Sequence, residues 1–398
     1  HGNLQVRAAW QRMHQAKLIA KQMRAGLYPS VNLNASISQA EPVNRFFPSS
    51  PVSIEASYEP DLFRKVGNSE AAALTNAMAA RDQVESLAMT LVAQIAETWF
   101  ALTAQRARLE LLEEQIKVSQ NFLELAQMRL GQGLGSGLDL LQQRQQLAAV
   151  EGQRPAALAM ETVLQNQLAV LTGRPPSGFQ VATKSLLPEL PGQPASGVPA
   201  DLLLRRPDVR AARLQVEAAD YQVAVAVANR LPGIRFGGSY GPFQRIDTTF
   251  STAAIWNVVA SLFAPIFQGG RLKAEVERSE SVVMEKSYLF GQALLQAMVE
   301  VENALAQEAG QVESVSELKR QLVMAEETLE EARQRYSAGL GNDSFIQILA
   351  ALSSLQRIEL SLLQAQQQAL SYRIQLCRAL GGSWSKELKV PSKGTTHE

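Results

Sequence analysis

The sequence predicts a mainly α-helical protein with a small β part, in which one structural unit occurs twice. Val6-Arg7-Ala8-Ala9 returns as Val209-Arg210-Ala211-Ala212, displaced by 203 residues. Gly133-Leu134-Gly135 returns as Gly339-Leu340-Gly341, displaced by 206. A displacement that grows slowly along the chain indicates two copies of one unit that differ by a few insertions.

A second observation is a heptad seam that both copies share. Its positions are spaced alternately three and four residues apart, which keeps one narrow stripe facing a neighbouring helix, as in a coiled coil. We therefore expect long coiled-coil helices in both copies. The seam positions are Leu109, Leu112, Ile116, Ser119, Leu123, Ala126 and Leu130, and, 206 residues on, Val315, Leu318, Leu322, Ala325, Leu329, Ala332 and Tyr336.

Composition excludes several classes of function. The 398 residues carry 38 basic and 38 acidic side chains, so the basic surplus of a nucleic-acid-binding protein is absent. Three histidines and one cysteine offer no imidazole metal site and no disulfide within the chain. Without a histidine pair, nucleophile motif or phosphate loop, we predict that the protein is not an enzyme and needs no cofactor or metal.

The sequence shows no run of 18 to 20 apolar residues, so we expect no transmembrane helix. The chain begins at His1 without an initiating Met, a signal peptide or a lipid-bearing cysteine. We expect that a segment has been removed from its N-terminus.

In the first copy, a helix is expected from residue 3 to about 28, ending before Pro29. Strict alternation of apolar and polar residues then predicts two strands, 31–38 and 52–58, which form a hairpin. A proline-free stretch from about 67 to 130 predicts a helix of roughly 95 Å. Glycines at 131–137 end it, and a return helix covers about 138–171, weakened at Gly152 and Pro155.

The second copy repeats these elements. We expect a helix over 208–229, strands over 234–240 and about 254–263, a long helix over 270–336, a turn at 338–342 and a return helix over 344–380. In the first copy the first and return helices have together nearly the length of the long one, so both can lie end to end along it. The predicted organisation is a first repeat (1–173), a Pro-rich linker (174–207), a second repeat (208–382) and a tail (383–398).

Four strands per chain are too few to close a sheet, and their apolar face needs partners. Association of three copies would give a closed barrel of twelve strands, with its apolar face toward lipid and its polar face toward water. The polar face is expected to include Asn32, Asn34, Ser36 and Arg235. The helices would continue the barrel as a helical cylinder, so the sequence predicts a duct.

Specific motifs connect this reading to a known family. The chain closely resembles the TolC-type outer-membrane factors, in particular the branch that serves resistance-nodulation-division efflux pumps. The motifs that carry the resemblance are Leu204-Arg205-Arg206-Pro207-Asp208-Val209-Arg210-Ala211-Ala212, Leu231-Pro232 with Gly238-Ser239-Tyr240-Gly241, Phe267-Gln268-Gly269-Gly270-Arg271, Arg335-Tyr336-Ser337-Ala338-Gly339, and Ala379-Leu380-Gly381-Gly382-Ser383-Trp384.

The resemblance implies a homotrimer in the Gram-negative outer membrane with a helical tunnel in the periplasm. Small molecules would leave through it once a periplasmic adaptor, bound to an inner-membrane transporter, docks on the closed helical end. The alternative within the family is the outer-membrane channel of a metal-ion efflux or type I secretion system. A purely structural coiled-coil scaffold would explain the seam, but not four alternating strands at matched places.

The chain departs from the family pattern at two places. It starts inside the first helix, without the usual preceding segment. Where many members carry entrance aspartates after the second turn, it has Gln347 and Ala350.

Candidate functional residues lie at the helical tips. The docking tips are expected at Gly133, Leu134, Gly135 and Ser136 and at Gly339, Leu340 and Gly341, because exposed leucines at a turn are unfavourable unless a partner covers them. Candidates for the periplasmic gate are Tyr336, which the resemblance suggests for the closing links, with Asp139, Asp343 and Gln347.

Overall fold

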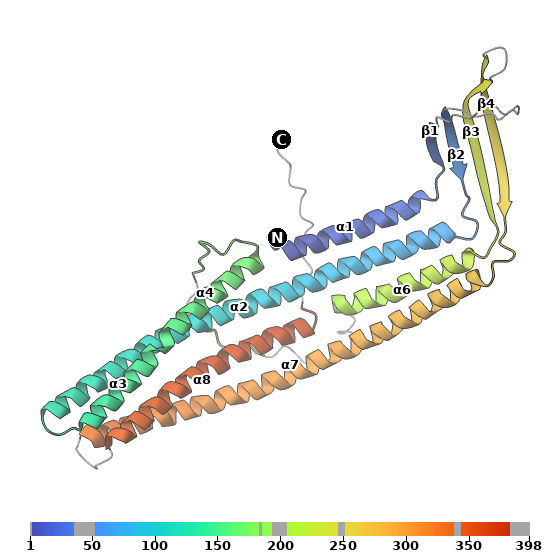
Figure 1. Ribbon diagram of the computed structural model, residues 1–398. Coiled ribbons are helices and arrows are strands. Elements are labelled where there is room, and N and C mark those ends of the chain that lie inside the picture. The colour runs from blue at the N-terminus through green and yellow to red at the C-terminus, as the bar shows by residue number, and fades with distance from the viewer. Residues whose placement is uncertain are drawn as a thin grey trace. The chain divides into compact units, whose positions relative to one another are not determined.

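The computed structural model describes residues 2–35, 52–182, 185–192, 205–245, 251–337 and 344–382. The order of helix, two strands, long helix and return helix occurs twice, as predicted (Figure 1). The first series is α1 (Leu4–Ala25), β1 (Ser30–Ala35), β2 (Val52–Tyr58), α2 (Lys65–Gly131), α3 (Gly137–Glu151) and α4 (Gln153–Thr172). The second series is α6 (Pro207–Ala228), β3 (Gly233–Arg245), β4 (Ser251–Phe263), α7 (Arg271–Ser337) and α8 (Ser344–Ala379).

Two compact units cut across the two copies. Unit 1 comprises His1–Arg7, Glu85–Arg206 and Leu295–Glu398, and unit 2 comprises Ala8–Val84 and Pro207–Leu294. The long helices α2 and α7 contribute to both units.

Two local features differ from the sequence expectation. Helix α1 begins at Leu4, where the Asn3 carboxamide oxygen accepts hydrogen bonds from the backbone N–H groups of Gln5 (2.8 Å) and Val6 (3.2 Å), so the expectation that the chain starts inside this helix is wrong. The first return helix is divided at Gly152. The physical reason is Pro155, which has no N–H to donate to the carbonyl four residues earlier.

The strands of unit 2 form one antiparallel sheet in the order β1-β2-β3-β4. Strand β3 is longer than predicted, because it continues through Pro242 to Arg245 while paired with β4. The described pairing between β2 and β3 stops at Tyr240, so Pro242 lies where β3 has no described neighbour on that side. A proline, which lacks the N–H of a sheet ladder, is tolerated at such a position.

The predicted seam is the packing face of α2 and α7 in unit 1. Every seam side chain is buried or half-buried except Leu130, which lies in the last turn of α2. From Val312 to Arg335, every residue of α7 outside the seam is exposed. A stripe this narrow is the contact surface of a coiled coil, as the 3.5-residue spacing predicted.

Matched hydrogen bonds fasten the return helix to the long helix in both copies. The Gln105 side chain donates to the Ala157 carbonyl (2.8 Å), and the Gln311 side chain donates to the Ala365 carbonyl (3.1 Å). The donors are 206 residues apart and the acceptors 208. The same contact therefore recurs in both copies. The displacement of the sequence repeat grows by two residues between the donor and the acceptor.

A second matched contact joins the start of each first helix to the end of each return helix. The Asn3 side chain donates to the Leu171 carbonyl (2.9 Å), and the Arg206 guanidinium donates to the Ala379 carbonyl (3.2 Å). All four of these residues belong to unit 1. The matched contacts support our proposal that 1–173 and 208–382 are structural repeats.

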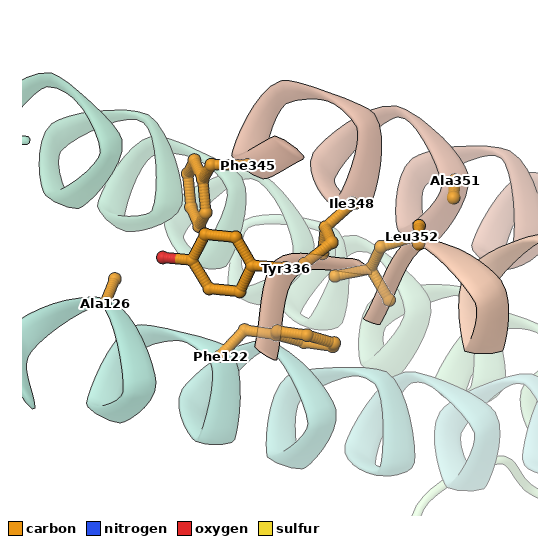
Figure 2. Packing of buried hydrophobic residues seen from close by; sticks show 8 residues of the cluster. Phe122, Ala126, Tyr336, Phe345, Ile348, Ala351 and Leu352 are labelled. Carbon is orange, nitrogen blue, oxygen red and sulfur yellow. The ribbon is translucent and has the colours of Figure 1, made fainter. Parts of the chain in front are cut away.

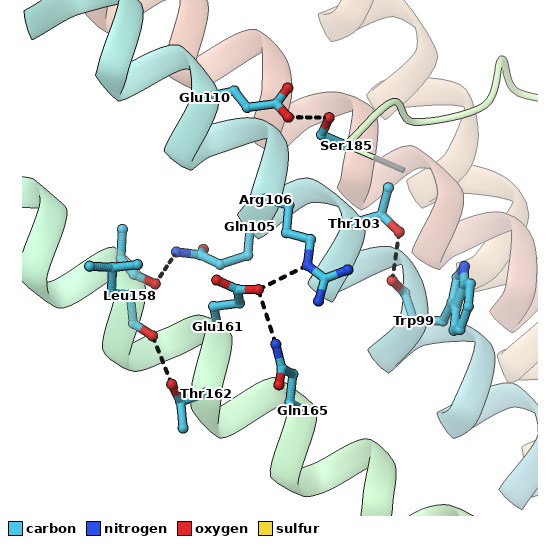
Figure 3. A network of polar contacts seen from close by, with 11 residues as sticks. Trp99, Thr103, Gln105, Arg106, Glu110, Leu158, Glu161, Thr162, Gln165 and Ser185 are labelled. Carbon is cyan, nitrogen blue, oxygen red and sulfur yellow. Dashed lines mark hydrogen bonds and ion pairs between the residues drawn. The ribbon is translucent and has the colours of Figure 1, made fainter. Parts of the chain in front are cut away.

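Polar and apolar contacts hold α4 against α2 in unit 1 (Figure 3). The Arg106 guanidinium pairs with the Glu161 carboxylate (2.8 Å), which also accepts a hydrogen bond from Gln165 (3.0 Å). Beside this network lies a buried cluster of Leu102, Leu164 and Leu168. Phe179 and Val181, from the segment after α4, pack against the cluster.

The described part of the Pro-rich linker is also fastened to unit 1. The Arg373 guanidinium donates to the carbonyls of Pro191 and Gly192. The same guanidinium also pairs with the carboxylate of Glu308, which is fully buried. A buried carboxylate requires such a partner, so this ion pair fixes both the linker and the contact between α7 and α8.

Two helices in the described part of the chain are long and apolar enough to cross a membrane by length and composition, although the sequence led us to expect no transmembrane helix. Within the described residues, α2 and the segment Phe345–Ala379 of α8 each contain an 18-residue stretch that meets the length and composition of a membrane span. Helices that bury apolar faces inside a protein satisfy the same test. In each of the two stretches, 22% of the residues are buried inside the chain, so burial within one copy does not by itself account for their composition.

Candidate functional site

The first helical tip is a compact turn whose predicted residues each have a structural task. Helix α2 ends in a Schellman motif, in which the Leu134 N–H donates to the Arg129 carbonyl (2.8 Å) and the Gly133 N–H to the Leu130 carbonyl (3.0 Å). Gly133 has a φ of 74°, which favours glycine. A Cβ on Gly135 would lie 3.0 Å from the Leu130 nitrogen, so the turn is too tight there for a side chain.

The other side of this turn is a capping box. The Ser136 hydroxyl accepts a hydrogen bond from the Leu138 N–H (3.1 Å), and the Asp139 carboxylate accepts one from the Ser136 N–H (3.2 Å). Asp139, predicted at the gate, therefore stabilises the start of α3. The second tip, Gly339, Leu340 and Gly341, lies outside the described residues, as does Asp343.

Leu134 of the first turn is 66% exposed. Leu138 and Leu141, which share one face of α3, are exposed as well. Sequence reasoning missed these two leucines, although their spacing of three residues at the start of a helix is a readable signal. Together, the three leucines form an apolar patch at the tip.

Tyr336 is the centre of a buried cluster near the same end of unit 1 (Figure 2). Its side chain is 4% exposed, and its ring lies 5.7 Å from that of Phe345 in α8. Phe122 of α2 lies beneath it, and Ile348 and Leu352 of α8 complete the cluster. The cluster joins the α2/α3 hairpin to the α7/α8 hairpin.

Arg129 of α2 makes two contacts with Tyr336. Its guanidinium donates to the Tyr336 carbonyl (2.7 Å) and lies 4.1 Å from the centre of the Tyr336 ring, a cation–π geometry. The Tyr336 hydroxyl is buried and has no hydrogen-bond partner within the described part of the chain. Burial raises the pKa of this hydroxyl, Arg129 opposes the rise and Asp139 adds to it.

The predicted gate residues are only partly brought together. The Asp139 carboxylate lies close enough to Tyr336 to raise the pKa of its hydroxyl. Gln347, in contrast, is exposed and is not part of the cluster. Arg129 and Phe345 are the functional candidates that sequence reasoning missed. Arg129 directly precedes the last seam position, and only the folded chain shows which neighbour it contacts.

A polar layer lies beside this apolar cluster and links three helices. The Gln143 side chain of α3 donates to the Ser119 carbonyl of α2 (2.8 Å). The Gln356 side chain of α8 donates to the Ser119 hydroxyl (3.4 Å), and the Gln115 side chain of α2 donates to the Gln356 carbonyl (3.2 Å). Because buried amides need specific partners, this layer fixes the register of α8 against α2 and α3.

Glu359 of α8 adds a charge to the polar layer. Its carboxylate accepts a hydrogen bond from the Gln115 side chain (2.7 Å). Burial raises the pKa of Glu359, the Gln115 hydrogen bond opposes the rise, and the nearby charges of Glu114 and Glu326 add to it. No group of three or more His, Cys, Asp and Glu side chains in the described ranges is placed to hold a metal ion.

The sheet of unit 2 has one apolar face. The opposite face is polar in β1 and β2 but mixed in β4, where Ile255, Val259 and Phe263 share it with Asn257 and Ser261. The register places Asn32, Asn34 and Arg235 on the polar face, as predicted, and Ser36 lies outside the described residues. Arg235 pairs there with Glu59 (3.1 Å). The apolar face consists of Val31, Leu33, Ala35, Val52, Ile54, Ala56, Tyr58, Ile234, Phe236, Gly238, Tyr240, Trp256, Val258, Ala260 and Leu262.

Known proteins share this combination of sheet and helices. The chain is similar to the pyoverdine export outer membrane protein OpmQ of Pseudomonas putida, with 27% identity over 393 residues that cover 96% of this chain and 83% of the relative. It is equally similar to the toluene efflux pump outer membrane protein TtgI of Pseudomonas putida, with 27% identity over 407 residues and the same coverage of 96% and 83%. The solved structure of the outer membrane protein VceC from Vibrio cholerae has the same fold, with a TM-score of 0.82 at 23% identity over 94% of this chain and 92% of that one.

The family described as outer membrane efflux protein matches residues 1–174 and 198–382, which include both series of elements. This match confirms the resemblance that the sequence motifs indicated. The chain belongs to the outer membrane efflux protein family.

Proposed function

We propose that three copies of this chain form the outer-membrane exit duct of a tripartite efflux pump. The duct carries small molecules passively from the periplasm to the outside. A periplasmic adaptor, which also binds an inner-membrane transporter, opens it by docking at the helical tips.

The observation that carries this proposal is the sheet of unit 2. Its apolar face suits lipid, and its polar face suits a water-filled lumen. The sheet order leaves the outer edges of β1 and β4 without a described partner strand. A membrane cannot satisfy the N–H and C=O groups of an open edge, so the edges must pair with other copies of the chain. Three four-stranded sheets close a barrel of twelve strands.

The helices supply the periplasmic wall of the duct. At 1.5 Å per residue, α2 and α7, with 67 residues each, are about 100 Å long. Between Val312 and Arg335, the side chains of α7 outside the seam are exposed, and they include Val323 and Met324. We assign this exposed surface to contact with a neighbouring copy, which would complete a helical cylinder.

The Tyr336 cluster is the proposed periplasmic gate. It ties the α2/α3 hairpin to the α7/α8 hairpin through apolar packing and through Arg129. Docking of an adaptor on the exposed Leu134 tip would act on the same hairpins. The energy of adaptor binding could thus be used to separate them.

The cargo is proposed to be small organic molecules. OpmQ and TtgI, to which the chain is similar along nearly its whole length, carry names that describe export of pyoverdine and of toluene. A passive duct has no need of a cargo-specific site, and selection would lie with the transporter.

Two measurements test the proposal. The detergent-solubilised protein should have a mass three times the 43.4 kDa of one chain, and, once its periplasmic end is opened, it should conduct ions in discrete steps in a planar bilayer. In a Cys377→Ala background, Val31→Cys combined with Val258→Cys should crosslink neighbouring copies through the β1 and β4 edges, whereas neither cysteine alone should. A stable monomer, or a trimer that never conducts, would overturn the proposal.

A further inference from the structure

Two strand-to-helix connections in unit 2 present exposed apolar pairs at matched positions of the repeat. The first, residues 59–64, leads from β2 to α2 and carries Leu62-Phe63. The second, residues 264–270, leads from β4 to α7 and carries Ile266-Phe267, displaced by 204 residues. Ile266 is 96% exposed and Phe267 is 88% exposed. Side chains this apolar and this exposed require a partner or an apolar medium.

The first connection is held in shape by the start of its helix. The Asp61 carboxylate accepts hydrogen bonds from the N–H groups of Val66 (3.0 Å) and Gly67 (2.7 Å), which caps α2. Arg64 adopts a φ of 56°, the one positive value among the described residues other than glycine. This tight turn leaves Leu62 and Phe63 outside the helix cap, where both are exposed.

The second connection reaches a similar result with glycines. Gly269 (φ 57°) and Gly270 (φ 85°) turn the chain immediately before α7, and the Arg271 N–H donates to the Gln268 carbonyl (3.0 Å). Both connections therefore combine an apolar pair, a left-handed turn and a long helix, in that order.

A hollow between the two connections is lined by the carboxylates of Glu59, Asp61 and Glu275 and by the cations of Lys65 and Arg271. Its carboxylates are already engaged: Glu59 pairs with Arg235, Asp61 caps α2, and Glu275 pairs with Arg278 (2.7 Å). Its two cations are less well satisfied. Lys65 has no ion pair in the described ranges, and Arg271, besides a weak attraction to Glu275, donates to the neutral side chain of Gln268.

If the sheet spans the outer membrane as proposed, the connections lie where it leaves the bilayer. They directly follow β2 and β4, whose apolar face meets lipid in an outer-membrane protein, and they lead into the periplasmic helices. Exposed aromatic and aliphatic side chains beside basic ones are the composition of a membrane interface, since the apolar parts enter the acyl region and the cations meet phosphate.

We propose that the two connections form a binding rim for phospholipids of the inner leaflet of the outer membrane. Leu62, Phe63, Ile266 and Phe267 enter the acyl region, and Lys65 and Arg271 bind the phosphate of an anionic headgroup such as that of phosphatidylglycerol. The rim fixes the depth of the duct in the membrane. It adds a lipid contact to the proposed duct, and it rests on the outer-membrane location of the sheet.

The first experiment locates Phe267 relative to lipid. Two single-tryptophan proteins are refolded into vesicles of phosphatidylethanolamine and phosphatidylglycerol. One keeps only Trp256, on the apolar face of β4, and the other carries Phe267→Trp with all native tryptophans replaced by phenylalanine. Ile266→Trp serves as a second reporter if Phe267→Trp fails to fold.

Quenching by brominated lipid and by aqueous iodide then separates three environments. Lipid quenching of the tryptophan at 267 with protection from iodide supports the rim. Quenching by iodide alone would place this side chain in water, and quenching by neither would place it against another copy of the chain; either result overturns the proposal. Quenching of Trp256 by lipid is the control for insertion of the sheet, so failure of the rim is distinguishable from failure of the duct.

The second experiment measures the headgroup. Mass spectrometry should find phosphatidylglycerol retained on the native trimer in preference to phosphatidylethanolamine. Each basic residue at an anionic membrane surface contributes about fivefold to binding, so Lys65→Gln with Arg271→Gln should reduce the retained anionic lipid by about tenfold or more.

The matched control is Lys117→Gln with Lys319→Gln, which removes the same charge from the same two helices within unit 1. It should leave lipid retention unchanged. Equal retention by both double variants would overturn the assignment of Lys65 and Arg271.

Discussion

Replacing Tyr336 with phenylalanine should leave the periplasmic end closed, whereas alanine should open it. The Tyr336 ring is almost fully buried, contacts Phe345, and lies under the Arg129 guanidinium. Removal of such a ring costs about 3 to 5 kcal/mol per chain. The hydroxyl has no described hydrogen-bond partner, so its removal should be neutral or should stabilise the chain by up to about 1 to 3 kcal/mol.

The assays are chemical unfolding of the detergent-solubilised protein and single-channel conductance. Tyr336→Ala should unfold more readily and should raise the fraction of time spent open, because three weakened clusters act in one trimer. Tyr288→Ala is the matched control, since Tyr288 lies in the same helix but is exposed, and it should change stability by less than about 0.5 kcal/mol. If Tyr336→Phe opens the channel as much as Tyr336→Ala, the hydroxyl has a partner in the assembled protein and the reasoning from ring packing is refuted.

Three further predictions concern other parts of the chain. Leu134→Asp should abolish capture of the adaptor in a pull-down while the melting temperature stays unchanged, and undiminished capture would exclude this tip from the interface. Because burial raises the pKa of Glu359, the folded chain favours the protonated form of this carboxyl more than the unfolded chain does. Glu359→Gln should therefore be more stable than the parent at neutral pH, and this advantage should vanish as the pH falls toward 4.5. Melting curves recorded at several pH values check this. Asp82→Ala should cost about 1 to 3 kcal/mol, because it removes a nearly buried partner of Arg210 at 2.9 Å, and a double-mutant cycle with Arg210→Ala that shows no coupling would contradict this.

Much of this protein was determined by the sequence itself. A period of 3.5 residues specifies which side of α2 and α7 is apolar, and a period of two residues specifies the two faces of the strands, since both periods are local properties of the backbone. The duplication was readable for the same reason, because each copy repeats the local pattern of the other. The contacts that Asn3 and Arg206 make were not predicted, because they join residues far apart in the sequence.

Only the tertiary structure decided which faces meet. Tyr336 could be recognised as a seam residue. Its contacts with Arg129 of α2 and Phe345 of α8 join different helices, and nothing in the local pattern specifies such a pairing. The order β1-β2-β3-β4 likewise depends on pairing between two distant hairpins. The sequence marked Phe267 only as the start of a family motif and did not mark Ile266 at all. Their exposure is set by the whole fold, whereas a local sequence period determines only which side chains share a face.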